Sequence, residues 1–255
     1  MGLEITKDID LALVILNLFV AFFAGLVFYL HRESKREGYP LVLDNPRGRV
    51  LDNALPTMPQ PKTYQLPHGG TATFPNKKLD QRVIAAAPAS RYPGSPLVPT
   101  GNPMLDGVGP AAWAERADVP DLTYGGLPKI VPMSTVPDFS IASNDPDPRG
   151  MKVLGADGKV AGTVTDLWVD QGEYLFRYLE VEISPALHVL LPMNFARVDG
   201  RKRQVRVKAI LASQFATVPA LKNPAQVTFL EEDKICGYFG GGYLYATPER
   251  AEPLL

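Results

Sequence analysis

Two carboxylates and an arginine stand close together in the C-terminal half of the chain: Asp170, Glu173 and Arg177. We expect Asp170 to end one strand, Glu173 to lie in the following loop and Arg177 to open the next strand. Clustered carboxylates can carry protons, because clustering and burial raise their pKa towards neutrality. A turn with solvated charges is the alternative, and these residues taken alone favour it.

Other ionisable residues are weaker candidates for proton chemistry. The charged run Glu231–Lys234 is typical of a solvated first helical turn, where acidic residues complement the helix dipole. Glu231 could also join the cluster around the arginine. Lys129 and His68 are lesser candidates, and His68, between a proline and a glycine, is expected to form a structural hydrogen bond. His188 is expected on a strand surface.

Composition excludes several classes of function. The formal net charge is −1, so no overall basic balance indicates a nucleic-acid partner. A single cysteine, Cys236, excludes an intrachain disulfide and a multi-cysteine metal site, and three histidines offer little for a histidine-based centre. No nucleophile elbow, glycine-rich phosphate loop or HExxH motif occurs. We therefore expect a chain that is not itself an enzyme and binds no metal or cofactor.

The N-terminal part of the chain is expected to be a membrane anchor. The run Leu11–Leu30 holds one conventionally polar residue, Asn17, and its twenty residues span ~30 Å as a helix, which matches a bilayer. A signal peptide is disfavoured by the acidic start, the length of the run and the missing small-residue cleavage site. A buried helix of a soluble domain is the remaining alternative.

The flanks of this span predict its orientation. Arg32, Lys35 and Arg36 follow the span, whereas Lys7 alone precedes it. The positive-inside rule therefore places the N-terminus outside and the rest of the chain in the cytoplasm. Tyr29 is expected at the membrane interface together with these three basic residues.

The middle of the chain is rich in proline. Of the 25 prolines, 19 lie in residues 40–148, and each excludes the interior of a helix. The segment nevertheless keeps apolar and aromatic residues and shows no repeat, unlike a disordered linker. We expect it to be ordered along the surface of a partner, with a free linker as the alternative.

The C-terminal part has the pattern of a small β domain. Asp157-Gly158 and Asp199-Gly200 are hairpin turns, and residues 176–183 alternate, with Leu179, Val181 and Ile183 on one face. Five or six short strands predict a compact barrel, and residues 209–215 and 226–239 are expected to be helical. The expected segments are 1–10 (outer tail), 11–31 (transmembrane helix), 32–105 (extended surface segment) and 106–255 (β domain, with its core at about 142–220 and a C-terminal helix at about 226–239).

Several stretches, taken in order along the chain, resemble one known family. With the acidic start and single span, they are similar to the H subunit of the purple-bacterial photosynthetic reaction centre, and the β domain resembles the PRC barrel. The stretches that carry the resemblance are Arg36–Leu41, Leu66–Gly69, Gly101–Pro110, Lys129–Met133, Asp166–Asp170, Tyr178–Glu182, Leu191–Met193 and Glu231–Tyr238.

This resemblance implies a subunit without pigment that caps the cytoplasmic face of the L and M subunits. Those subunits would hold bacteriochlorophyll, bacteriopheophytin, quinones and non-haem iron, and light-harvesting antenna helices would surround them. The expected location is the intracytoplasmic photosynthetic part of the bacterial inner membrane, in contact with lipids, and the resemblance also allows a cytochrome subunit. The H subunit would stabilise the complex and shape proton transfer to the secondary quinone during electron transport. A purely structural scaffold is the alternative.

The resemblance also suggests roles for single residues. Glu173 would be a proton-path carboxylate, Arg177 its electrostatic modulator and Asp170 an outer relay. Some relatives carry a surface histidine pair where protons enter, but residues 123–128 here contain neither histidine nor acid. The point at which protons enter therefore stays open, with Asp118 and Asp121 as substitute collectors, and no metal site is assigned.

Overall fold

The computed structural model describes residues 10–39, 42–45, 48–51, 55–76, 80–92 and 94–251. The chain divides into two compact units. The first comprises residues 1–81 with 92–94, and the second comprises residues 82–91 with 95–255. The expected acidic tail at residues 1–9 lies outside the described residues, and the expected boundary at 105/106 stays a prediction.

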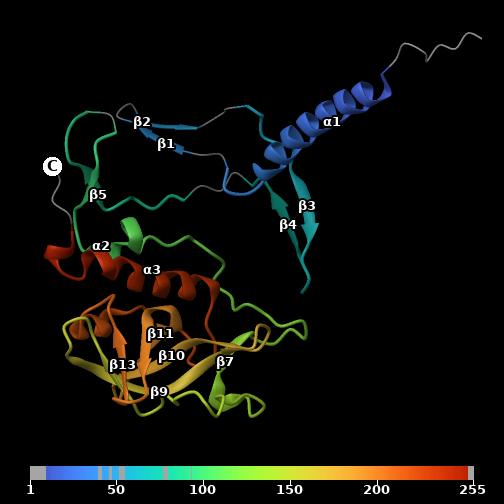
Figure 1. Ribbon diagram of the computed structural model, residues 1–255. Coiled ribbons are helices and arrows are strands. Elements are labelled where there is room, and N and C mark those ends of the chain that lie inside the picture. Colours follow the sequence, from blue (N-terminus) through green and yellow to red (C-terminus); the bar gives the residue numbers. More distant parts are fainter. Residues whose placement is uncertain are drawn as a thin grey trace, which may run out of the picture. The chain divides into compact units, whose positions relative to one another are not determined.

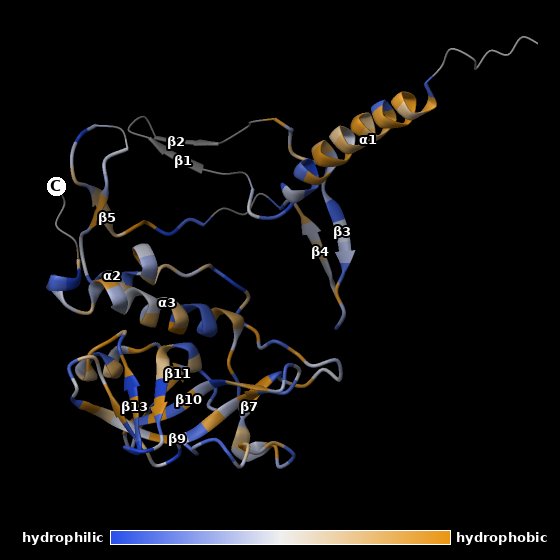
Figure 2. Cartoon of the chain, in the orientation of Figure 1, coloured by the Kyte–Doolittle hydropathy of each residue, from blue (hydrophilic) through white to orange (hydrophobic). Residues whose placement is uncertain are grey.

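The first unit begins with one long apolar helix, α1 (Leu11–Ser34). The Asp10 carboxylate caps it by accepting the backbone N–H groups of Ala12 and Leu13, at 3.0 and 3.2 Å. No residue of α1 is buried by the rest of the chain, so its apolar side chains are exposed along its length, as Figure 2 shows in orange. By length and composition, this helix can cross a membrane. Its 24 residues give ~36 Å, slightly longer than the expected span 11–31.

Short hairpins follow the helix in the proline-rich region. β1 (Val42–Asn45) pairs with β2 (Gly48–Leu51), and β3 (Lys62–Gln65) pairs with β4 (Thr71–Phe74). In the second unit, β5 (Ala86–Pro88) pairs with β6 (Leu97–Pro99). Prolines end these strands within a few residues, so the region forms separate two-stranded ribbons (Figure 1) and no larger sheet among the described residues.

The second unit contains a seven-stranded sheet with the order β11-β10-β9-β8-β13-β12, and β7 pairs with β9 off this path. All pairs are antiparallel except β8 with β13. Gly158, at φ +73°, makes the tight turn expected between β8 and β9. The strands are β7 (Ile130–Pro132), β8 (Lys152–Leu154), β9 (Val160–Asp170), β10 (Leu175–Ser184), β11 (Leu187–Pro192), β12 (Ala196–Asp199) and β13 (Gln204–Val207).

The core lies between this curved sheet and helix α3 (Phe229–Tyr245), which covers one end of the sheet (Figure 1). Alternate strand residues such as Leu179 and Val181 are fully buried, as their spacing predicts. Phe239 of α3 contacts Phe215, with ring centroids 5.8 Å apart. Short helical turns complete the unit: α2 (Pro103–Asp106), η1 (Gly109–Ala111), η2 (Met133–Thr135), η3 (Met193–Phe195), η4 (Ala212–Thr217) and η5 (Pro248–Arg250).

Two predicted helices have different bounds in the structure. The helix expected at 209–215 is observed as the 3-10 segment η4, which starts three residues later, at Ala212. Ala209 and Ile210 precede this segment and are fully buried in the core. The helix expected at 226–239 is α3, which starts where Thr228 and Glu231 form a capping box. It continues through Gly240, Gly241 and Gly242, beyond the expected end at residue 239.

Close packing explains why the glycines do not end α3. A Cβ at Gly237 would lie 2.8 Å from the Ala111 carbonyl oxygen, and one at Gly242 would lie 2.5 Å from that of Ala209. Glycine therefore lets the helix approach neighbouring backbone, and this packing outweighs its low helix propensity.

Candidate functional site: a charged cluster around Lys129

The pairing of β7 with β9 brings a lysine from a distant part of the chain to the β9–β10 turn. Ile130 lies opposite Asp170 in this register, so Lys129 reaches the end of β9. The Gln171 backbone N–H donates to the Lys129 carbonyl at 2.9 Å. A Cβ at Gly172 would lie 2.8 Å from Lys129 Cε, so glycine at this position makes room for the lysine side chain.

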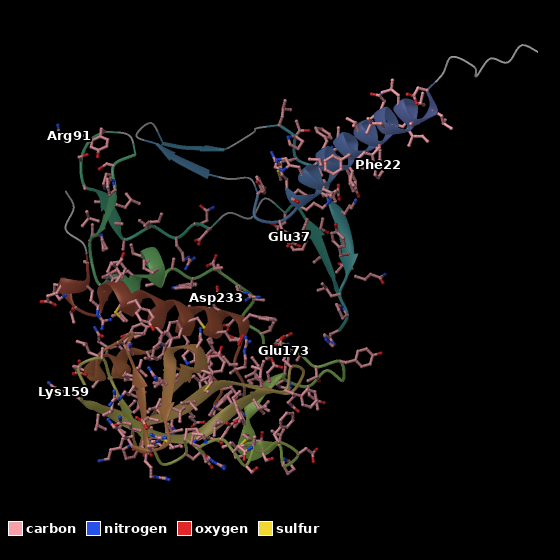
Figure 3. All side chains as sticks on the ribbon, viewed as in Figure 1. Phe22, Glu37, Arg91, Lys159, Glu173 and Asp233 are labelled. Carbon is pink, nitrogen blue, oxygen red and sulfur yellow. The ribbon has the colours of Figure 1, made fainter. Side chains whose placement is uncertain are left out.

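The ammonium group of Lys129 contacts three carboxylates. Its Nζ lies 3.3 Å from Glu173 Oε1, 3.5 Å from Asp170 Oδ2 and 3.6 Å from Asp121 Oδ2. Arg177 Nη1 lies 3.9 Å from Glu173 Oε2. We call these five residues, Asp121, Lys129, Asp170, Glu173 and Arg177, the Lys129 cluster. Figure 3 labels Glu173 in the second unit.

The carboxylates of the cluster differ in exposure. Asp170 is 1% exposed, and its Oδ1 accepts the backbone N–H groups of Gly172 and Glu173, both at 2.9 Å. The Glu173 side chain is 52% exposed. A buried carboxylate needs hydrogen bonds and a counter-charge, and Lys129 supplies the charge for Asp170. Glu173 is therefore the solvent-exposed end of the cluster and Asp170 its desolvated end, the reverse of the outer position that the resemblance suggested for Asp170.

Lys129 is held in its charged form. Burial alone would lower its pKa, but the hydrogen bond to Glu173 and the charges of Asp170, Glu173 and Asp121 together raise that pKa above its ordinary value. A lysine with a raised pKa does not release its proton near neutral pH. It acts as a fixed cation between the three carboxylates.

A second acid, the half-buried Glu232, lies beside this cluster. The Tyr178 hydroxyl donates to Glu232 Oε1 at 2.9 Å, and burial raises the pKa of Glu232, although Tyr178, Arg177 and Arg116 lower it in part. Burial also raises the pKa of Tyr178 and of nearby Cys236. Glu232 was not singled out in the sequence, where it was one member of a charged run. Tyr178 lies on the opposite face of β10 from Leu179 and Val181, but its contact with α3 leaves it 2% exposed.

The structure places other candidates apart from the cluster. Glu231 is buried, and its carboxylate accepts the backbone N–H groups of Thr228 and Lys222, at 2.9 and 2.7 Å, so it caps α3 instead of reaching Arg177. Asp118 pairs with Lys222 and accepts a hydrogen bond from Thr228 Oγ1, and these contacts lower its pKa. An acid with a lowered pKa is a poor proton collector near neutral pH.

The remaining candidates lie on other elements. His68 lies in the turn between β3 and β4 of the first unit, whereas the Lys129 cluster belongs to the second unit. His188 is half-exposed on β11, and its Nδ1 lies 2.8 Å from Glu180 Oε1. Within the described ranges, no group of three histidine, cysteine or acidic side chains could hold a metal ion.

The expected membrane-interface residues differ from one another in exposure. Tyr29 is 53% exposed, whereas Lys35 and Arg36 are buried by the chain itself. Arg36 donates to both carboxylate oxygens of Glu33 and to the carbonyl oxygen of Gln60, and Lys35 lies over the ring of Tyr39. Arg32 is half-buried near the end of α1. The basic end of the helix is therefore fixed to the segment that follows it.

The raised pKa of Glu232 predicts how stability depends on pH. The folded state holds a proton on Glu232 at pH values where the unfolded chain has released it, so this residue makes stability fall as pH rises from about its ordinary pKa of 4.5 through the raised value. Glu232→Gln should therefore stabilise the chain at neutral pH, with a gain that disappears in acid. Denaturant unfolding of the full chain in detergent at several pH values measures this. A pH-independent difference would contradict it.

Comparisons with protein families agree with this architecture. Residues 3–135 match the family described as "Photosynthetic reaction centre, H-chain N-terminal region". Residues 142–213 match the "PRC-barrel domain" and include strands β8 to β13. The first match covers more than half of the chain, and both matches confirm the resemblance seen in the sequence. This chain, with one apolar helix and a mainly-β second unit, belongs to the family of photosynthetic reaction centre H subunits, the membrane-anchored components of a multisubunit photosynthetic complex.

Proposed function

We propose that this chain caps the cytoplasmic face of the L and M subunits and passes protons towards the secondary quinone through the Lys129 cluster. The observation that carries the proposal is the gradient of exposure within one ion-paired group, from Glu173 at the surface to the buried Asp170. Capping and proton transfer then belong to the same subunit, which performs no redox chemistry of its own.

The geometry supports a division of roles within the cluster. Glu173 is exposed enough to exchange protons with water, and Asp170 lies within reach of the same ammonium group. Lys129 keeps its charge and holds the two carboxylates close, while Arg177 adds a second positive charge beside Glu173. The secondary quinone, held by partner subunits, would accept electrons and the delivered protons. Glu232, with its raised pKa, adds a further carboxyl group able to hold a proton.

Exposed apolar side chains support the capping role. Large apolar residues outside α1 are left uncovered by the chain itself, which is unusual for a protein without partners. Several of them lie in the region that we expect to follow a partner surface, among them Val83 (92% exposed), Tyr92 (62%), Leu127 (65%) and Tyr124 (fully exposed). Contact with L and M would bury such side chains.

The membrane arrangement follows from α1 and its flanks. The helix would cross the inner membrane once beside the helices of L and M and the antenna. The N-terminus would then be periplasmic, because Arg32, Lys35 and Arg36 follow the span. The exposed apolar surface of α1 would contact lipid and neighbouring helices.

A purely structural scaffold is the alternative, and removing the subunit tests both roles. The chain is stripped from the purified complex, and the full-length wild-type chain or Glu173→Gln is then added back. We expect removal to slow the second electron transfer to the quinone, and only the wild-type chain to restore its rate. Restoration by both chains would support the scaffold alone, and an unchanged rate after removal would contradict both roles.

A further inference from the structure

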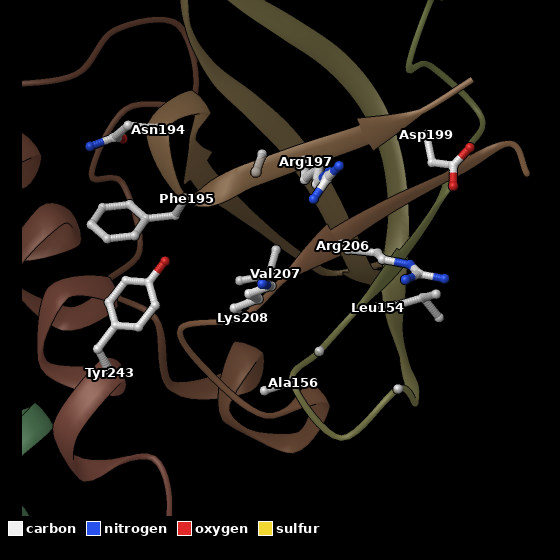
Figure 4. Close-up of a pocket in the computed structure, with 13 residues that line it drawn as sticks. Leu154, Ala156, Asn194, Phe195, Arg197, Asp199, Arg206, Val207, Lys208 and Tyr243 are labelled. Carbon is white, nitrogen blue, oxygen red and sulfur yellow. The ribbon is translucent and has the colours of Figure 1, made fainter. Parts of the chain in front are cut away.

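A pocket of about 840 Å³ opens on the second unit, outside the Lys129 cluster. Strands β12 and β13 form one wall of the pocket, and Tyr243 of α3 lies beside Phe195 at one end (Figure 4). The loop through Gly155 and Ala156 closes another side. A volume of this size is typical of sites for small molecules.

Three positive side chains line the strand wall. Arg197 of β12 lies directly opposite Arg206 of β13 in the antiparallel register, so both project from the same face of the sheet. Lys208 follows Arg206 by two residues and lines the same pocket. Like charges placed directly opposite each other destabilise a strand pair, so folding alone does not favour this arrangement.

These three cations have no ion-pair partner among the residues that the structure describes. Asp199 is the acidic residue in the lining, and its Oδ1 accepts the Lys202 backbone N–H at 3.0 Å in the hairpin turn. With its amide oxygen turned towards Arg206, Gln204 accepts from Nε and Nη2 at 2.8 and 2.9 Å. This contact orients the guanidinium group and leaves its other donors available.

The opposite end of the pocket is aromatic. The rings of Phe195 and Tyr243 lie 6.0 Å apart between centroids, at 37° to each other. Tyr243 is 53% exposed, so part of its ring is accessible from solvent. A planar or apolar group in the pocket could therefore contact an aromatic surface while a charged group reaches the arginines.

We propose that this pocket binds a small molecule that carries a phosphate group next to a ring, as a nucleotide does. The phosphate pairs with Arg197, Arg206 and Lys208, because planar guanidinium groups match phosphate oxygens in paired hydrogen bonds. The ring lies against Phe195 and Tyr243. This site is independent of the proposed proton path, since the two share no residue.

Isothermal titration calorimetry on the complex in a non-ionic detergent tests the proposal. The probes are ADP, inorganic pyrophosphate and glycerophosphoglycerol, a soluble lipid headgroup. We expect saturable binding of ADP, weakened at least tenfold by Arg197→Gln and by Arg206→Gln. Lys159→Gln is the matched control, because Lys159 is exposed and does not line the pocket, and it should leave the affinity unchanged.

Further comparisons separate the parts of the proposal. Tyr243→Ala should weaken ADP binding but not pyrophosphate binding. Thermal unfolding of Arg197→Gln should match or exceed that of the wild type, because the substitution removes repulsion between the strands. Absence of ADP binding, or equal loss in Lys159→Gln, would overturn the proposal. Tighter binding of glycerophosphoglycerol than of ADP would overturn the role of the ring and assign the site to a lipid headgroup.

Discussion

Glu173→Gln is expected to slow the second, proton-coupled electron transfer to the secondary quinone by about 100-fold, the lower end for loss of one proton-transferring group. Glutamine keeps the shape of the side chain but cannot take up and release a proton near neutral pH. Assembly should be unaffected, because the Glu173 side chain is 52% exposed and its ion pairs lie near the surface. Flash-induced absorption changes in the purified complex, recorded over a range of pH, measure the rate.

Glu182→Gln is a suitable control for this experiment. Glu182 lies on β10, the strand that follows Glu173, and pairs in register with Thr163 and His188, away from the Lys129 cluster. The same change from carboxylate to amide at this position should leave the rate unchanged. Equal rates for wild type and Glu173→Gln at every pH would remove Glu173 from the proton path.

Gly242→Ala is expected to lower the free energy of unfolding by about 1–3 kcal/mol, as for overpacking of a core. The added Cβ would meet the side chain of Ile210 and would lie 2.5 Å from the carbonyl oxygen and 2.9 Å from the carbonyl carbon of Ala209. Backbone atoms of a buried segment cannot move aside as a flexible side chain can. Denaturant unfolding of the full chain in detergent, followed by the fluorescence of buried Trp168, measures the change.

Gly240→Ala is the matched control two residues earlier in the same helix. Its Cβ would meet a single atom, the Pro110 carbonyl oxygen at 3.2 Å. Alanine stabilises a helix by up to about 1 kcal/mol relative to glycine, so this variant should be as stable as the wild type or more stable. Equal loss in both variants would show that α3 does not depend on close approach at Gly242.

Local patterns predicted much of the fold. The apolar run at residues 11–30 predicted α1, and the alternating pattern at residues 176–183 predicted β10 with Leu179 and Val181 buried. Gly158 marked a real turn between strands. The predicted end of α3 was wrong because the true end depends on residues far away in sequence. The backbone of Ala111 and Ala209 lies so close to Gly241 and Gly242 that only glycine fits there, although helix propensity alone predicts that glycines end a helix.

The site was predictable only where its residues are near in sequence. Asp170, Glu173 and Arg177 lie on one turn and its flanking strands, so they could be selected together. The close contact of Lys129 and Asp121 with this turn depends on the pairing of β7 with β9. The pair of Tyr178 and Glu232 joins a strand to a helix 54 residues away.

The neighbouring acids Glu231 and Glu232 show a related limit of sequence reasoning. Adjacent residues on a helix point in different directions, so Glu231 turns back to cap α3 whereas Glu232 reaches Tyr178. Only the packed structure shows that Glu232, and not Glu231, lies beside Tyr178 and Arg177 of β10.

Time-resolved proton uptake in the assembled complex tests the central claim most directly. A pH-indicator dye reports proton uptake after the second flash, while absorption at the quinone reports electron transfer in the same sample. For Glu173→Gln, we predict that both processes slow by the same factor relative to wild type and to Glu182→Gln. Proton uptake at the wild-type rate in Glu173→Gln would contradict a proton path through the Lys129 cluster.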